Sequence, residues 1–79
     1  MKVRVLFFGA TATATGMRET DVDLNDGSRL AAVTDLILKE HPALASHRLL
    51  FSINQEYADP NSPISGGDEL AIFTAVSGG

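Results

Sequence analysis

The chemistry that this sequence could perform is concentrated in its last four residues, Val76-Ser77-Gly78-Gly79. Two terminal glycines have no Cβ, so they can pass through a narrow channel and leave the terminal carbonyl carbon unshielded. A terminal carboxylate is ionised at neutral pH and is a poor electrophile, so it must first be activated, for instance as an acyl-adenylate. The same four residues could instead be an inert frayed end, as chain termini often are. The sequence therefore leaves open a reactive tail and an inert one.

The other polar side chains offer little for catalysis or metal binding. The chain has no cysteine, which excludes a thiolate nucleophile, a disulfide and a sulfur-ligated metal. His41 and His47 have no acidic cluster at ligand spacing, and nothing in the sequence places Asp21 and Asp23 as an acid–base pair. No catalytic triad and no phosphate-binding glycine loop is visible. We therefore expect no bound cofactor, no metal and no catalytic side chain.

The charge distribution argues against nucleic-acid binding. The formal net charge is −4, all six lysine and arginine residues fall within residues 1–48, and residues 49–79 hold four acidic residues and no basic one. Because affinity for nucleic acid comes largely from neutralising phosphates, an acidic domain is not expected to bind it. The acidic C-terminal part is either a solvated face or a surface for a basic partner.

Length and apolar content predict a single domain over residues 1–79. Of the 79 residues, 44% are hydrophobic, which suffices for a small core. Apolar runs such as Val5–Phe8 and Leu49–Phe51 are far shorter than the ~20 residues of a membrane span. Lys2 and Arg4 interrupt what would be the apolar part of a signal peptide. We therefore expect a cytoplasmic protein that binds no membrane.

The elements that must position the tail follow from the apolar periodicity. Alternating apolar residues predict four strands, at residues 2–8, 18–24, 48–54 and 69–74. Ser28 is the expected N-cap of a helix over 29–40, which His41-Pro42 ends. The helix has an apolar stripe at three–four spacing, made of Leu30, Val33, Leu36 and Ile37. Residues 10–16 are a helical turn or loop closed by Gly16. The order β-β-α-β-β is an α+β pattern.

Several motifs together resemble one family. They are Lys-Val-x-Val-Leu-Phe-Phe over residues 2–8, Gly16, Asn54-Gln55-Glu56-Tyr57, Gly67-Asp68-Glu69 followed by Leu70–Phe73, and Val76-Ser77-Gly78-Gly79. Over essentially the whole chain the sequence is similar to the small subunits of molybdopterin synthase, which are ubiquitin-like sulfur carriers. The resemblance implies a β-grasp fold, with a mixed sheet, one main helix on one face and an extended tail. Residues 1–74 would be the globular body and residues 75–79 a flexible, reactive tail.

The resemblance also implies a reaction cycle. An adenylating and sulfur-transferring enzyme would use ATP to activate the Gly79 carboxylate, which would become a thiocarboxylate. Gly78 would let the tail enter the large synthase subunit, where the sulfur passes to a cyclic pterin precursor during molybdenum cofactor synthesis. The chain would be a non-catalytic sulfur-donor subunit in a heterotetramer of two small and two large subunits. A β-grasp carrier for another pathway, a modifier that forms isopeptide bonds with lysines, and an interaction module with an inert tail are the alternatives.

By position, the resemblance assigns partner contacts to Phe8, Tyr57, Phe73, Val76 and Ser77. Phe8 and Phe73 could instead be core residues. The strand phase favours the interface, because Phe8 lies opposite the face of Val3, Val5 and Phe7, and Phe73 lies opposite that of Leu70 and Ile72.

Two segments depart from the family pattern. Thr11-Ala12-Thr13-Ala14 replaces an arginine-containing segment, which puts a basic contact near the tail in doubt. Thr74-Ala75 replaces two prolines of the family pattern. Because prolines stiffen the backbone, we expect the free tail of this chain to be more mobile than that of family members with the prolines.

Overall fold

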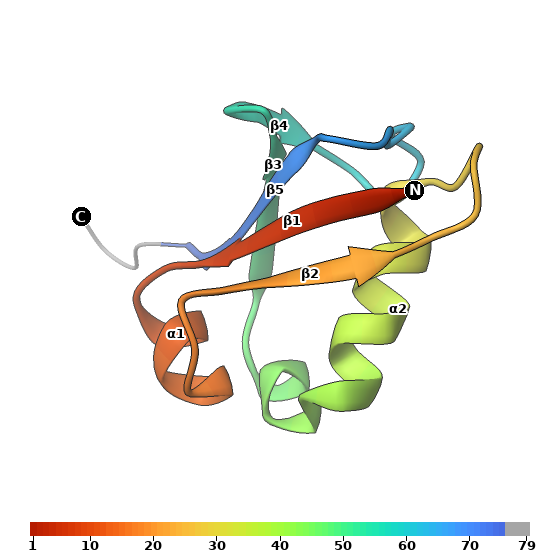
Figure 1. Cartoon of the computed structure of the whole chain (residues 1–79). Helices are drawn as coiled ribbons and strands as arrows, with labels where there is room; N and C mark the ends of the chain where they lie inside the picture. Colours follow the sequence, from red (N-terminus) through yellow and green to blue (C-terminus); the bar gives the residue numbers. More distant parts are fainter. Residues whose placement is uncertain (76–79) are drawn as a thin grey trace.

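Eight short elements make up residues 1–75, the part of the chain that the structure, a computed structural model, describes. In chain order they are β1 (Lys2–Phe7), α1 (Ala10–Thr15), β2 (Glu19–Asp23), α2 (Leu30–Glu40), the 3-10 helix η1 (Pro42–Ser46), β3 (Leu49–Ile53), β4 (Glu56–Ala58) and β5 (Glu69–Thr74). The strands form one sheet in the order β2-β1-β5-β3-β4, with β1 and β5 parallel and the other neighbours antiparallel. Figure 1 shows α1, α2 and η1 on one side of the sheet. The predicted α+β architecture is confirmed.

The core lies between this sheet and the helices. Its ten buried apolar residues are Val3, Val5, Phe7, Leu30, Val33, Ile37, Leu44, Ile64, Leu70 and Ile72. β1 and β5 each contribute alternate residues to it, as the pleat of a strand requires. The phase predicted for both strands is therefore confirmed, and the residues between the buried ones face away from α2.

The start of α2 differs from the prediction. Arg29, and not Ser28, is the N-cap, and its side chain makes no capping hydrogen bond. The amide groups of Leu30 and Ala31 instead donate to the carbonyl oxygens of Ser62 (2.9 Å) and Pro60 (3.1 Å). A loop distant in sequence thus satisfies the free donors of the first turn, which leaves the Ser28 hydroxyl to bond the Asn25 carbonyl at 2.7 Å.

The apolar stripe of α2 is narrower than predicted. Leu30, Val33 and Ile37 are buried, but Leu36 is 38% exposed. At 3.6 residues per turn, Leu36 lies roughly 90° around the helix from the centre of the buried three. Leu36 therefore belongs to the flank of the helix and is not a core residue.

A fifth strand, β4, is absent from the sequence prediction. The chain reverses after β3 through Asn54 and Gln55, whose φ angles are 50° and 72°. β4 then pairs antiparallel with β3, and Tyr57 lies opposite Ser52. The usual signature of such a two-residue turn, Asn-Gly or Asp-Gly, is missing here, and the strand has only three residues. This short strand matters because it puts Tyr57 on the sheet.

The ambiguous segment after β1 is a helix. α1 ends at Gly16, which adopts a left-handed conformation (φ 73°) and donates its amide proton to the Ala12 carbonyl at 2.9 Å. Glycine has no Cβ to oppose such a φ angle, so Gly16 closes α1 as predicted. A turn at residues 65–68 precedes β5, and in it the Asp68 amide donates to the Ser65 carbonyl oxygen at 3.1 Å. None of the helices in residues 1–75 has the length and apolar character needed to cross a membrane.

Candidate functional site

The tail starts from the middle of the sheet. β5 lies between β1 and β3, and its last residue, Thr74, pairs with Leu49. Ala75 is exposed and is the only predicted tail residue that the structure describes. The four other residues predicted to belong to the functional tail, Val76, Ser77, Gly78 and Gly79, lie outside the described residues. The structure describes the surface around the root of the tail, where β5 ends at Thr74 and Ala75 follows.

Three aromatic side chains lie at this root, on the face of the sheet without helices. We call Phe8, Tyr57 and Phe73 the aromatic patch. Phe8 is 52% exposed, Tyr57 is 82% exposed and Phe73 is half-buried. The ring centroids of Tyr57 and Phe73 are 6.1 Å apart, with planes tilted by 51°. Neither Phe8 nor Phe73 is a core residue, so the interface interpretation of the strand phase fits the structure.

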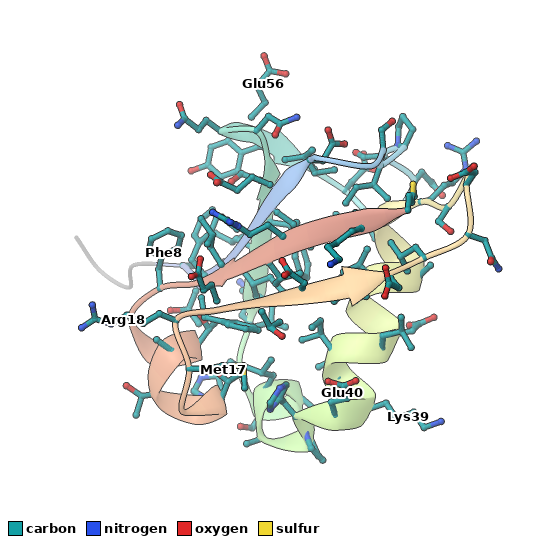
Figure 2. The ribbon with its side chains drawn as sticks, viewed as in Figure 1. Phe8, Met17, Arg18, Lys39, Glu40 and Glu56 are labelled. Carbon is teal, nitrogen blue, oxygen red and sulfur yellow. The ribbon has the colours of Figure 1, made fainter. Side chains whose placement is uncertain are left out.

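A shallow hollow of about 360 Å³ opens between the two phenylalanines. Phe8, Gly9, Phe73 and Thr74 line it. Figure 2 shows Phe8 beside the end of β5, on the side away from α2. The hollow therefore lies directly at the root of the tail and has apolar walls on two sides. It has the size and character to receive an apolar side chain from a partner.

Two leucines extend the aromatic patch and were not singled out from the sequence. In register, Leu50 lies opposite Phe73, and Leu6 lies opposite Ala71. Residues paired in this way point to the same face of a sheet, so both leucines share the open face. Both are partly exposed. Their signal was present in the strand phase. Leu6 alternates with the buried Val5 and Phe7, and Leu50 alternates with Leu49 and Phe51, which pack against the core.

The far half of the open face is charged. Lys2 pairs in register with Asp23, and Arg4 with Asp21. The Arg4 Nε also lies 3.9 Å from a carboxylate oxygen of Glu19. Each aspartate thus lies opposite a basic residue, so Asp21 and Asp23 are not arranged as an acid–base pair.

Two arginines lie near the root of the tail. Arg18 follows α1, and its carbonyl oxygen accepts the Phe7 amide at 2.8 Å; Arg48 directly precedes Leu49, the partner of Thr74. Both are exposed, and within residues 1–75 neither forms an ion pair. Although the segment 11–14 has no arginine, basic side chains are therefore present at this end of the molecule.

Asp68 has a structural task. One of its carboxylate oxygens accepts the Asn54 side-chain amide at 3.0 Å, and the other accepts the Ser65 backbone amide at 2.7 Å. The Asn54 side chain in turn accepts the Glu69 amide at 3.0 Å. These bonds join the β3–β4 turn to the turn before β5, so the Asp68 carboxylate stabilises the fold.

The histidines do not belong to the aromatic patch. The His41 ring packs edge-on against Phe7, with centroids 6.1 Å apart. Within residues 1–75, no group of three histidine, cysteine or carboxylate side chains could hold a metal ion. The described part of the chain thus offers an exposed aromatic patch with a hollow beside the root of the tail.

Comparison with known proteins gives a consistent picture. The model of the ThiS family matches residues 5–79. A molybdopterin synthase sulfur carrier subunit of Chlamydomonas reinhardtii is 35% identical, with 100% of both chains covered. The crystal structure of SAMP1 from Haloferax volcanii superposes with a TM-score of 0.88 at 28% identity, over 100% of both chains. A chain in the complex of subunits 1 and 2 of molybdopterin-converting factor from Helicobacter pylori gives 0.71 at 26%, again over 100% of both. These neighbours confirm the β-grasp expectation.

Proposed function

The chain belongs to the ThiS family, and from this premise we propose that it is the sulfur carrier subunit of a molybdopterin synthase. The full-length similarity to subunits of that name, at 35% identity in Chlamydomonas reinhardtii and 30% in Homo sapiens, supports this function. The structural observation that carries it is the aromatic patch and its hollow at the root of the tail. A carrier must dock beside the site into which its tail reaches, and an exposed apolar patch at the root of the tail supports such docking.

The proposed chemistry takes place at the Gly79 carboxylate. An activating enzyme transfers the AMP part of ATP to this carboxylate and releases pyrophosphate. A sulfide equivalent then displaces AMP from the acyl carbon, which yields the thiocarboxylate. In the synthase the sulfur passes to the cyclic pterin precursor. None of these steps requires a catalytic side chain of this protein, whose part is to bind its partners and present the tail.

The length of the tail suits this task. β5 ends at Thr74, and the tail beyond it, residues 75–79, is five residues, which reach at most ~18 Å when fully extended. A body docked through the aromatic patch can therefore place Gly79 well inside a partner. The Helicobacter pylori neighbour, solved as a complex of subunits 1 and 2, supports the large subunit as this partner. We extend the proposal to an assembly of two small and two large subunits and to a separate activating enzyme.

A second candidate function has a specific observation in its favour. The SAMP1 structure from Haloferax volcanii superposes with a TM-score of 0.88, whereas the Helicobacter pylori subunit gives 0.71. A second structure from Haloferax volcanii is described as small archaeal modifier protein 1. A modifier would use the same activated glycine to form an isopeptide bond with a lysine amine. The names of the curated relatives favour the sulfur carrier for molybdopterin.

The experiment that tests the proposal changes only the chain end. We would reconstitute pterin sulfuration from the protein, the activating enzyme, ATP, a sulfide source and the large subunit. Removing Gly79, or adding one residue after it, should abolish the reaction while the melting temperature stays the same. Full activity of an extended protein that remains unprocessed would sink the proposal.

A further inference from the structure

Thr11 is the only polar residue among residues 1–75 whose side chain is fully buried. It lies in the first turn of α1, next to the residues that join this helix to β1. Its hydroxyl is too deeply buried to meet a substrate or a modifying enzyme. A buried hydroxyl costs stability unless its hydrogen bonds are made, so its partners indicate its role.

The Thr11 hydroxyl joins the end of β1 to β5. The Phe8 amide donates to Oγ1 at 2.9 Å, and Oγ1 lies 2.7 Å from the Ile72 carbonyl oxygen and 2.9 Å from that of Phe8. A hydroxyl has one proton to donate, and the shorter contact assigns it to Ile72. The direct bond from the Phe8 amide to the same Ile72 carbonyl is longer, at 3.3 Å. The hydroxyl therefore provides the tighter of the two links.

This link is placed where the aromatic patch is formed. Phe8 follows the last residue of β1, and Phe73 follows Ile72 along β5. After Phe8 the chain turns sharply through Gly9, at φ 58° and ψ −124°. Phe8 thus lies beyond the regular β1–β5 pairing, which ends at Phe7 and Ile72. Within residues 1–75, its backbone amide is held to β5 by the Thr11 hydroxyl and the 3.3 Å bond.

We propose that Thr11 is a positioning residue whose hydroxyl fixes Phe8 against β5 and so sets the hollow between Phe8 and Phe73 that receives the large subunit. The identity of that partner rests on the function proposed above. Thr11 is fully buried, so its side chain is not available for direct contact with a partner. It acts through Phe8, so its removal weakens binding only while Phe8 is present.

The first measurement uses the free protein and needs no partner. Thr11→Val removes the hydroxyl at nearly constant shape, Thr11→Ser retains it, and Thr13→Val is the matched control, since Thr13 is exposed on the same helix. Hydrogen exchange of the Phe8 amide should become about five- to tenfold faster in Thr11→Val relative to that of Val5, and should not change in the other two variants. An unchanged Phe8 amide in Thr11→Val would overturn the placement role.

The second measurement is the affinity for the large subunit. Thr11→Val should bind about five- to tenfold more weakly, and this loss should vanish when Phe8 is also replaced by alanine. Val33→Ala is a core variant away from the patch, so it should lose stability but bind normally. Thr11→Ser should bind normally even if it is less stable. A loss that persists in full beside Phe8→Ala, or weak binding by Thr11→Ser, contradicts the proposal.

The two failures are distinguishable. If the unaltered protein does not bind the large subunit, the proposed function is wrong, and the exchange of the Phe8 amide alone then decides the role of Thr11. If the unaltered protein binds and Thr11→Val binds equally well, the role of Thr11 is wrong and the proposed function stands.

Discussion

Phe7 and Phe8 are adjacent in the chain and face opposite sides of the sheet, so they allow a sharp prediction. Phe8→Ala should weaken binding to the large subunit and cost much less folding stability than Phe7→Ala. Full burial of a phenylalanine side chain stabilises by about 1.5–3 kcal/mol, and Phe8 is 52% exposed before binding. About half of that gain, together with the gap left by the lost ring, gives about 1–2 kcal/mol, or roughly five- to thirtyfold in Kd.

The folding cost should follow the opposite order. Phe8 already buries about half of its side chain within its own chain, so Phe8→Ala should lower the free energy of unfolding by about 1 kcal/mol. Phe7 is only 2% exposed, so Phe7→Ala should cost about 3–5 kcal/mol, which a domain of this size can barely tolerate. Urea denaturation measures both variants, and titration calorimetry measures Phe8→Ala with the large subunit.

The control is Leu36→Ala, because Leu36 is similarly exposed but lies on α2, away from the aromatic patch. It should bind normally. Normal binding by Phe8→Ala, or an equal loss in Phe8→Ala and Leu36→Ala, would refute the assignment of the patch as the docking surface.

Further predictions concern other parts of the molecule. Tyr57→Ala should leave the melting temperature nearly unchanged, because Tyr57 is 82% exposed, and should weaken binding by about 1–3 kcal/mol in the same titration. Asp68→Ala should lower the free energy of unfolding by about 1–3 kcal/mol, since two hydrogen bonds to its carboxylate are lost; unaltered urea denaturation would contradict this. Glu56 is exposed and points into solvent at the β3–β4 hairpin (Figure 2), so Glu56→Gln should reduce the on-rate and its salt dependence if acidic residues steer association. Ser28→Ala should cost less than the ~1 kcal/mol of a lost N-cap, as urea denaturation can check.

The role of Asp68 changes how the charge asymmetry should be tested. Asp68 and Glu69 are adjacent acidic residues of the C-terminal part, but neutralising both would be a poor test of electrostatic steering. Since Asp68 holds two turns together, that double variant would mix steering with unfolding. An on-rate of Glu56→Gln that equals that of the unaltered protein, at every salt concentration, would mark the acidic part as ordinary solvated surface.

Strand phase was the most informative property of the sequence. The alternation of Val3, Val5 and Phe7 predicts Phe8 on the open face. Phe8 lines the hollow there together with Phe73, although β1 itself ends at Phe7. The same logic placed Phe73, and it would have found Leu6 and Leu50. These are local rules, and local rules are readable from the residues themselves.

The features that could not be predicted depend on contacts between distant segments. Ser28 has the right residue type for an N-cap. The amide groups at the start of α2 are instead satisfied by the carbonyl groups of Pro60 and Ser62, which lie in a loop distant in sequence. The β4 strand follows a turn without a glycine. Thr11 lies in a low-complexity segment, and its link to Ile72 spans sixty-one positions along the chain. No local pattern reports such pairings.

The central claim concerns one atom at Gly79, and an intact-mass measurement tests it most directly. The protein would be incubated with the activating enzyme, ATP and a sulfide source. Its intact mass would then be measured by mass spectrometry before and after the large subunit and the cyclic pterin precursor are added. We expect a mass increase equal to the exchange of one oxygen for one sulfur, located at Gly79 and lost once the pterin is added. An unchanged mass, or a Gly79 adduct on a lysine in place of the thiocarboxylate, would contradict it.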